Sequence, residues 1–158
     1  MNMPFIYGKT RPPVSKAASS GQSLSLLPNP RILVADDDPA TTSSLVAFAR
    51  ANNYRIVSVQ DGGEAYRLLQ SDADFRVAII SMSMPNIRGV DIVRHMKTEN
   101  RLKRIPVIVV TGDDGLQLIS ESFAAGAMAF LAKPFAAEQL WRTVRMVCEL
   151  PRQKRRAA

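Results

Sequence analysis

The sequence lacks several features that would place it in common protein classes. Its single cysteine, Cys148, excludes an internal disulfide and fits a reducing cytosol. No apolar run approaches the roughly 20 residues that span a bilayer. The N-terminus also lacks the run of about 7–15 apolar residues that marks a secretory signal. We therefore expect a cytoplasmic protein with no membrane segment.

Acidic residues are absent from both ends of the chain. Residues 1–30 contain three basic side chains and residues 151–158 contain four, with no carboxylate in either segment. These seven charges account for the whole net charge of +7, so residues 31–150 are neutral. We interpret the basic excess as a property of the two ends and not of a binding face on the fold. Short basic ends bind nucleic acids or acidic surfaces weakly, so we do not expect nucleic-acid association as the main function.

The composition predicts one folded domain with two appendages. An apolar content of 46% suffices for a core at this length. Five of the ten prolines fall in residues 1–30, with serine and glycine between them, which predicts a disordered or loosely docked extension. Residues 31–150 are predicted to form the domain, and residues 151–158 a basic tail.

Within the predicted domain, apolar runs of strand length alternate five times with helical patterns. Such alternation favours right-handed crossovers and a parallel sheet covered on both faces, which is a doubly wound α/β fold. The predicted strands are 31–35, 54–59, 75–80, 105–110 and 128–132, and the predicted helices lie near 39–52, 65–69, 89–99, 114–125 and 135–150.

Four of the predicted strands end in polar residues. The first is followed by the acidic run Asp36–Asp38, the third by Ser81, the fourth by Thr111 and the fifth by Lys133. Because the carboxyl ends of parallel strands lie along one edge of a sheet, we expect these side chains to converge in one crevice.

Four segments resemble motifs of the receiver domain of two-component response regulators. They are Ile32–Pro39, Met84–Gly89, Val109–Gly112 and Phe130–Phe135, and they occur in the family's order and spacing. The resemblance covers residues 31–150. It implies a flavodoxin-like (βα)5 fold with a five-stranded parallel sheet in the order 2-1-3-4-5.

The resemblance also implies a metal site in the crevice. Asp36 and Asp37 match the acidic pair that holds Mg²⁺, Asp37 directly and Asp36 through water. Ser83 matches the position whose backbone carbonyl is a further ligand. The structural alternative is that the two acids only cap the helix that follows them.

Three further residues match the family's switch positions. Thr111 matches the hydroxyl that moves to the phosphoryl group, Phe130 the aromatic residue that swings inward on activation, and Lys133 the lysine that pairs with phosphate. Each also has a structural interpretation. Thr111 would be a backbone-bonding residue at a strand end, Phe130 a fixed packing residue, and Lys133 the partner of the acids in an ion pair.

The chain departs from the family at Ser81. The family places its phosphoacceptor aspartate four residues before the proline that is Pro85 here, and that position is Ser81. A serine hydroxyl becomes nucleophilic only when a base takes its proton. The only histidine, His95, is predicted on a helix away from the crevice, and Lys133 would be cationic if it pairs with the acids. We therefore expect the aspartyl-phosphate switch to be lost.

The serine also predicts weak metal binding. Mg²⁺ prefers an octahedral set of hard oxygens and is usually held by carboxylates and waters. Two carboxylates in place of the family's three remove a direct ligand and one negative charge, and they relieve like-charge crowding. We expect a crevice that folds more easily without metal and holds Mg²⁺ weakly.

Together these features predict a signalling module and not an enzyme. We expect a stand-alone receiver-like protein, because eight residues follow Leu150, that acts by protein–protein interaction without aspartyl phosphorylation. The expected surface is the fourth helix, fifth strand and fifth helix, with Trp141, Arg142 and Arg145 as candidate anchors; the alternative for Trp141 is a place in the core. The expected partners are a histidine kinase, a phosphotransfer or downstream signalling protein, or a second copy in a homodimer. The alternative is a phosphorelay receiver that uses Ser81 or a nearby acid as acceptor.

Overall fold

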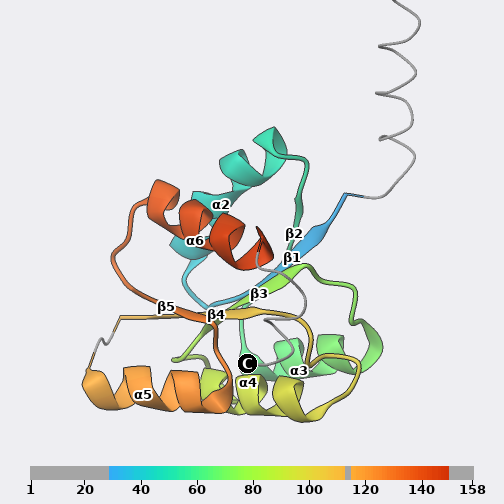
Figure 1. The fold of residues 1–158 in the computed structure, drawn as a ribbon, viewed down its shortest axis with the longest axis vertical. Helices are drawn as coiled ribbons and strands as arrows, with labels where there is room; N and C mark the ends of the chain where they lie inside the picture. The colour runs from blue at the N-terminus through green and yellow to red at the C-terminus, as the bar shows by residue number, and fades with distance from the viewer. Residues whose placement is uncertain (1–28, 113–114, 150–158) are drawn as a thin grey trace, which may run out of the picture.

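The structure, a computed structural model, describes residues 29–112 and 115–149 of the chain (Figure 1). The predicted basic tail lies outside these residues, as does the predicted extension except for Asn29 and Pro30. Among the residues described, no helix is both long and apolar enough to cross a membrane.

Strands and helices alternate along the described chain, as the sequence predicts. The strands are β1 (Arg31–Ala35), β2 (Arg55–Val59), β3 (Val77–Ser81), β4 (Val107–Thr111) and β5 (Ala129–Ala132). The helices are α2 (Pro39–Ala51), α3 (Gly62–Ser71), α4 (Gly89–Thr98), α5 (Leu116–Ala125) and α6 (Ala137–Glu149). All strand pairs are parallel, and the sheet order is β2-β1-β3-β4-β5. The predicted flavodoxin-like fold is confirmed.

The helices cover the sheet on both faces. Helices α2 and α6 lie on one face, and α3, α4 and α5 lie on the other (Figure 1). The strands serve both layers because side chains alternate along a strand. In β3, Ala78 and Ile80 belong to the core beneath α3, α4 and α5, while Val77 and Ile79 belong to the core beneath α2 and α6. β3 is therefore buried from end to end.

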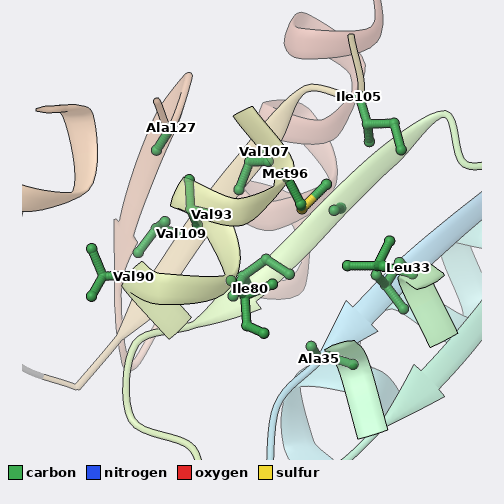
Figure 2. Packing of buried hydrophobic residues seen from close by; sticks show 14 of the residues in the cluster. Leu33, Ala35, Ile80, Val90, Val93, Met96, Ile105, Val107, Val109 and Ala127 are labelled. Carbon is green, nitrogen blue, oxygen red and sulfur yellow. The ribbon is translucent and has the colours of Figure 1, made fainter. Parts of the chain in front are cut away.

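Figure 2 shows the larger core at close range. Val93 and Met96 of α4 lie against Ile80 of β3 and Val109 of β4, and all four side chains are fully buried. Burying an aliphatic side chain of this size contributes about 1.5–3 kcal/mol to stability. This packing fixes α4 on the sheet and holds the carboxyl ends of β3 and β4 in place.

Trp141 of α6 is a core residue. Its side chain is only 6% exposed. It stacks on Phe48 with ring centroids 6.4 Å apart and meets Tyr54 edge-on at 5.5 Å. The interpretation of Trp141 as a surface anchor is therefore wrong, because Leu140, Trp141 and Val144 form the buried face of α6. The other two candidates, Arg142 and Arg145, are exposed.

Candidate functional site

The carboxyl ends of four strands bring the predicted polar residues to one edge of the sheet. β3 lies between β1 and β4, so Ser81 at its end has Asp36 beyond one neighbouring strand and Thr111 at the end of the other. Lys133 follows β5, and its amide N–H donates to the carbonyl of Thr111 at 2.7 Å. Lys133 Nζ reaches across to Asp36 Oδ2 at 2.9 Å. The structure therefore places these residues around one crevice.

Asp36 is the centre of a buried hydrogen-bond network. The residue is 2% exposed, and Thr41 Oγ1 donates to its Oδ2 at 2.6 Å. The amide N–H of Asp38 donates to Oδ1 at 3.0 Å, and Lys133 Nζ donates to the same oxygen at 3.1 Å. A buried carboxylate without partners is strongly unfavourable. These three donors engage both oxygens of Asp36 and hold it in place.

The other two acids of the run have different surroundings. Asp38 is the N-cap of α2, because its side chain accepts from the amide of Ala40 at 3.0 Å and Pro39 begins the helix. The helix is therefore capped by Asp38 and not by Asp36 or Asp37. Asp37 is exposed. Of the acidic pair, Asp37 alone is directed to solvent.

Ser81 is fully buried at the end of β3. Its Oγ accepts a hydrogen bond from the amide of Ser83 at 3.3 Å. Ser83 is itself exposed, whereas Met82 and Met84 on either side of it are buried. The hydroxyl of Ser81 thus stabilises the first turn of the loop that leads from β3 to α4.

Two close backbone contacts hold that loop in place. A Cβ on Gly89 would lie 1.9 Å from the carbonyl oxygen of Ser81, and a Cβ on Gly62 would lie 2.0 Å from the carbonyl oxygen of Ile87. The amide of Gly62 also donates to the carbonyl of Pro85 at 3.0 Å. Only glycine allows the starts of α3 and α4 to approach the loop this closely.

Thr111 and Phe130 lie on the β4 and β5 side of the crevice. Thr111 is 2% exposed and lines a cavity of about 370 Å³ together with Ser83, Arg88 and Gly112. Phe130 is half-buried and packs against the core beneath α3, α4 and α5. This contact is consistent with a packing residue.

His95 lies away from the crevice, as predicted. It belongs to α4, and its ring contacts Tyr66 of α3 at a centroid distance of 4.8 Å. Its Nε2 is also 3.4 Å from the side-chain nitrogen of Gln70. His95 therefore cannot act as a base on Ser81.

Comparison with known proteins agrees with this geometry. Residues 32–145 match the family described as the response regulator receiver domain. The chain belongs to this family. It is 29% identical over 110 residues to chemotaxis protein CheY1 of Helicobacter pylori strain J99, covering 68% of this chain and 89% of CheY1.

Solved receiver structures show the same fold. The chemotaxis response regulator CheY4 of Vibrio cholerae is 26% identical, with a TM-score of 0.69 over 75% of this chain and 98% of CheY4. The receiver domain of the sensor histidine kinase PA1611 of Pseudomonas aeruginosa is 24% identical, with a TM-score of 0.68 over 77% of this chain and 99% of that one. That receiver has a magnesium ion coordinated in its active site cleft.

The donor set in this receiver domain fits a magnesium ion poorly. Across residues 29–112 and 115–149, no group of three or more His, Cys, Asp or Glu side chains is arranged to hold a metal. Both oxygens of Asp36 are engaged by protein donors, and Asp37 is the one member of the predicted pair that faces solvent. Ser81 adds a hydroxyl where a third carboxylate would complete a set of hard, charged ligands.

Sequence reasoning missed Thr41, which donates the shortest hydrogen bond to Asp36. A signal was available, because Thr41 lies in the first turn of α2, three residues after the N-cap Asp38. The first-turn side chains of this helix point back toward the strand end that precedes it. A hydroxyl at that position is well placed to reach Asp36, the first acid after the strand.

Proposed function

We propose that this receiver domain signals by protein–protein interaction and without an aspartyl phosphate. The observation that carries the proposal is Ser81. Its position, four residues before Pro85, corresponds to that of the family's acceptor. Its hydroxyl oxygen accepts a hydrogen bond from the amide of Ser83. Lys133, which would pair with a phosphoryl group, is paired with Asp36 instead. The hydrogen bond of Ser81 and the ion pair of Lys133 thus form without a phosphoryl group in the crevice.

The alternative acceptor, the Ser81 hydroxyl, is supported less well. Its activation would need a base, and the amine of Lys133 is held in an ion pair with Asp36. Ser81 is also 0% exposed, so an external kinase could not reach it without local opening of the loop. We therefore assign the crevice a structural role and Mg²⁺ a weak interaction with it.

The proposed working surface is formed by α5, β5 and α6. The described residues include four exposed large apolar side chains, and three of them lie on these helices: Leu116 at 82%, Phe123 at 46% and Met146 at 54% exposure. Arg142 and Arg145 on α6 add exposed charges. Apolar anchors with a charged rim are typical of protein interfaces. The proposed partner is a histidine kinase, a phosphotransfer or downstream signalling protein, or a second copy of this chain, in the cytoplasm.

Treatment with acetyl phosphate and Mg²⁺, followed by intact mass measurement, tests the proposal. We expect no adduct under conditions that fully modify a receiver with an aspartate acceptor. An added phosphoryl group that hydroxylamine removes would be an acyl phosphate and would contradict the proposal. An adduct that resists hydroxylamine and disappears in Ser81→Ala would establish the serine alternative.

A further inference from the structure

A groove lies at the end of the sheet opposite the crevice. It has a volume of about 450 Å³ and is formed where α2 ends and β2 begins. Asn53 makes the turn between them with a left-handed φ of 62°, while its amide donates to the carbonyl of Arg50 at 3.3 Å. The turn places Arg50 and Arg55 on the same groove, together with Asn29 and Tyr54.

Two exposed arginines, Arg50 and Arg55, line this groove. A third exposed arginine, Arg76, lies at the same edge of the sheet, because its amide donates to the carbonyl of Arg31 and Arg31 is in register with Arg55. Burial raises the pKa of Tyr54, and the charge of Arg76 is near enough to oppose that shift. Within residues 29–112 and 115–149, no ion pair involves any of the three.

Other arginines at this end of the molecule do have acidic partners. Arg31 pairs with Asp72 at 2.7 Å, and Arg101 pairs with Glu99 at 3.2 Å. The three groove arginines are thus a local excess of positive charge. The opposing charges at this edge are Glu149, whose carboxylate acts on Tyr54, and Asp74, whose carboxylate acts on Arg31.

Residues 31–150 are neutral as a whole, but their charged side chains are not spread evenly over the domain. The acidic run Asp36–Asp38 and Asp61 follow strands and lie at the crevice edge. Arg55 and Arg76 precede strands and lie at the opposite edge, where Asp72 and Asp74 lie beside Arg31. A net charge of zero over these residues does not fix where the charges lie. The order of the strands places Arg55 and Arg76 at one edge of the sheet.

Both basic ends of the chain connect to the folded domain near this groove. Asn29, the first described residue, lines it. Cys148, one residue before the end of α6, is close enough to Tyr54 to contribute to the raised pKa of its phenol. Residues 1–28 carry three basic side chains and residues 150–158 carry four, and neither segment contains an acid. Both described ends of the domain therefore continue into sequence that is basic and free of acids.

We propose that the groove lined by Arg50 and Arg55, together with Arg76 at the same edge of the sheet, binds the phosphate backbone of a nucleic acid. Guanidinium groups match phosphate in a bidentate geometry, which favours arginine where phosphates are recognised. An anionic membrane fits less well, because Tyr66, Leu116, Phe123 and Met146, the large apolar side chains exposed in the described residues, do not line the groove. Contacts of this kind are salt-dependent and tolerant of sequence. The inference does not depend on the function proposed for the crevice.

Fluorescence anisotropy of a labelled DNA oligonucleotide, single-stranded and duplex, over a series of salt concentrations tests this inference. The test variant of the full chain is Arg50→Glu, Arg55→Glu, Arg76→Glu. Its matched control is Arg67→Glu, Arg142→Glu, Arg145→Glu, which changes the net charge equally at exposed arginines that do not line the groove. We expect the groove variant to bind at least about tenfold more weakly. For duplex DNA its salt slope should fall by roughly 0.9 per lost phosphate contact.

Two further measurements keep the inference falsifiable. Circular dichroism should show that both variants are folded, and lysine at the three groove positions should restore most of the affinity. Equal weakening in the groove and control variants would show an effect of net charge alone and overturn the proposal. So would unchanged affinity in the groove variant, which would assign binding to the chain ends. Co-sedimentation with phosphatidylglycerol vesicles in the absence of oligonucleotide binding would replace it with a membrane interaction.

Discussion

Lys133 and Asp36 are 97 positions apart in the chain and lie 2.9 Å apart across the carboxyl ends of the strands. The carboxylate is buried, whereas the lysine side chain is 20% exposed. The pair therefore neutralises the deepest acid of the crevice with a protein group. This relationship leads to the first prediction.

Asp36→Ala should lower the free energy of unfolding by about 3 kcal/mol, at the lower end of the range for removing one partner of a buried pair, because Lys133 is partly solvated. Urea denaturation measures the change. The double variant Asp36→Ala, Lys133→Met should recover part of the loss, since no charge is then left without its partner. A double variant no more stable than the single one would contradict this account.

Ser81→Asp should create a metal-responsive crevice. A third carboxylate near Asp36 adds like charge at a buried site, so we expect a loss of about 1–3 kcal/mol in the absence of divalent ions. Mg²⁺ should then raise the melting temperature of this variant and leave that of the wild type almost unchanged. Ser81→Asn, similar in size and uncharged, is the control. An equal response of the two variants to Mg²⁺ would argue against a carboxylate-dependent site.

Gly89→Ala should destabilise the protein by about 3 kcal/mol or more, because its Cβ would lie 1.9 Å from the carbonyl oxygen of Ser81 and the backbone would have to shift. Gly112→Ala is the matched control at the same edge of the sheet. A Cβ on Gly112 meets no atom within 4 Å, so its stability should change by about 0.5 kcal/mol or less. Thermal and urea unfolding of the two variants give the comparison, and similar losses in both would count against the close approach.

The Arg31–Asp72 pair should contribute to acid sensitivity. The hydrogen bond from Arg31 lowers the pKa of Asp72 below its ordinary value of 3.8. As pH falls, the unfolded chain therefore takes up a proton at this carboxylate before the folded chain does. The contribution of the pair is complete above the ordinary pKa and is lost as pH falls through the folded value. Unfolding free energies of Asp72→Asn and wild type should differ near neutrality and converge in acid; a constant difference would exclude this origin.

Trp141→Ala should affect stability, whereas Leu116→Asp should affect partner binding. Loss of the buried indole should cost about 3–5 kcal/mol of stability. Leu116 is 82% exposed, so its substitution should leave stability within about 0.5 kcal/mol while weakening binding to a partner protein. Unfolding curves and a pull-down from the source cell report the two effects. Unchanged capture of every partner by Leu116→Asp together with Phe123→Asp would place the interface elsewhere.

The sequence predicted the fold because its apolar runs have strand length and each is followed by a helical pattern. The element ends were less predictable. Phe75 is an apolar core residue, yet it precedes β3, and Ser81 is polar, yet it is the last residue of that strand. At the start of β3, burial begins before the strand does, at Phe75. At its end, the strand includes the polar residue Ser81. An apolar run therefore locates a strand but not its exact ends.

The sequence predicted which residues would meet at the candidate site, but not all of the side-chain contacts around them. The convergence of Asp36, Thr111 and Lys133 follows from parallel strands alone. The hydroxyl of Thr41 and the environment of Trp141 depend on how α2 and α6 rotate over the sheet, which apolar spacing determines only within part of a turn. The arginine groove depends in addition on the left-handed turn at Asn53, which joins two elements that pattern analysis treats separately.

Trp141 also gives this protein an internal spectroscopic probe. It is the only tryptophan in the chain, so its emission is free of overlap from a second indole. Its ring contacts Tyr54, which lines the arginine groove, and Phe48 of α2. A ligand that settles against Tyr54 should alter the emission intensity or wavelength without any attached dye, while unfolding should shift the emission to the red as the indole becomes hydrated. One unlabelled sample can thus report groove occupancy and folding together.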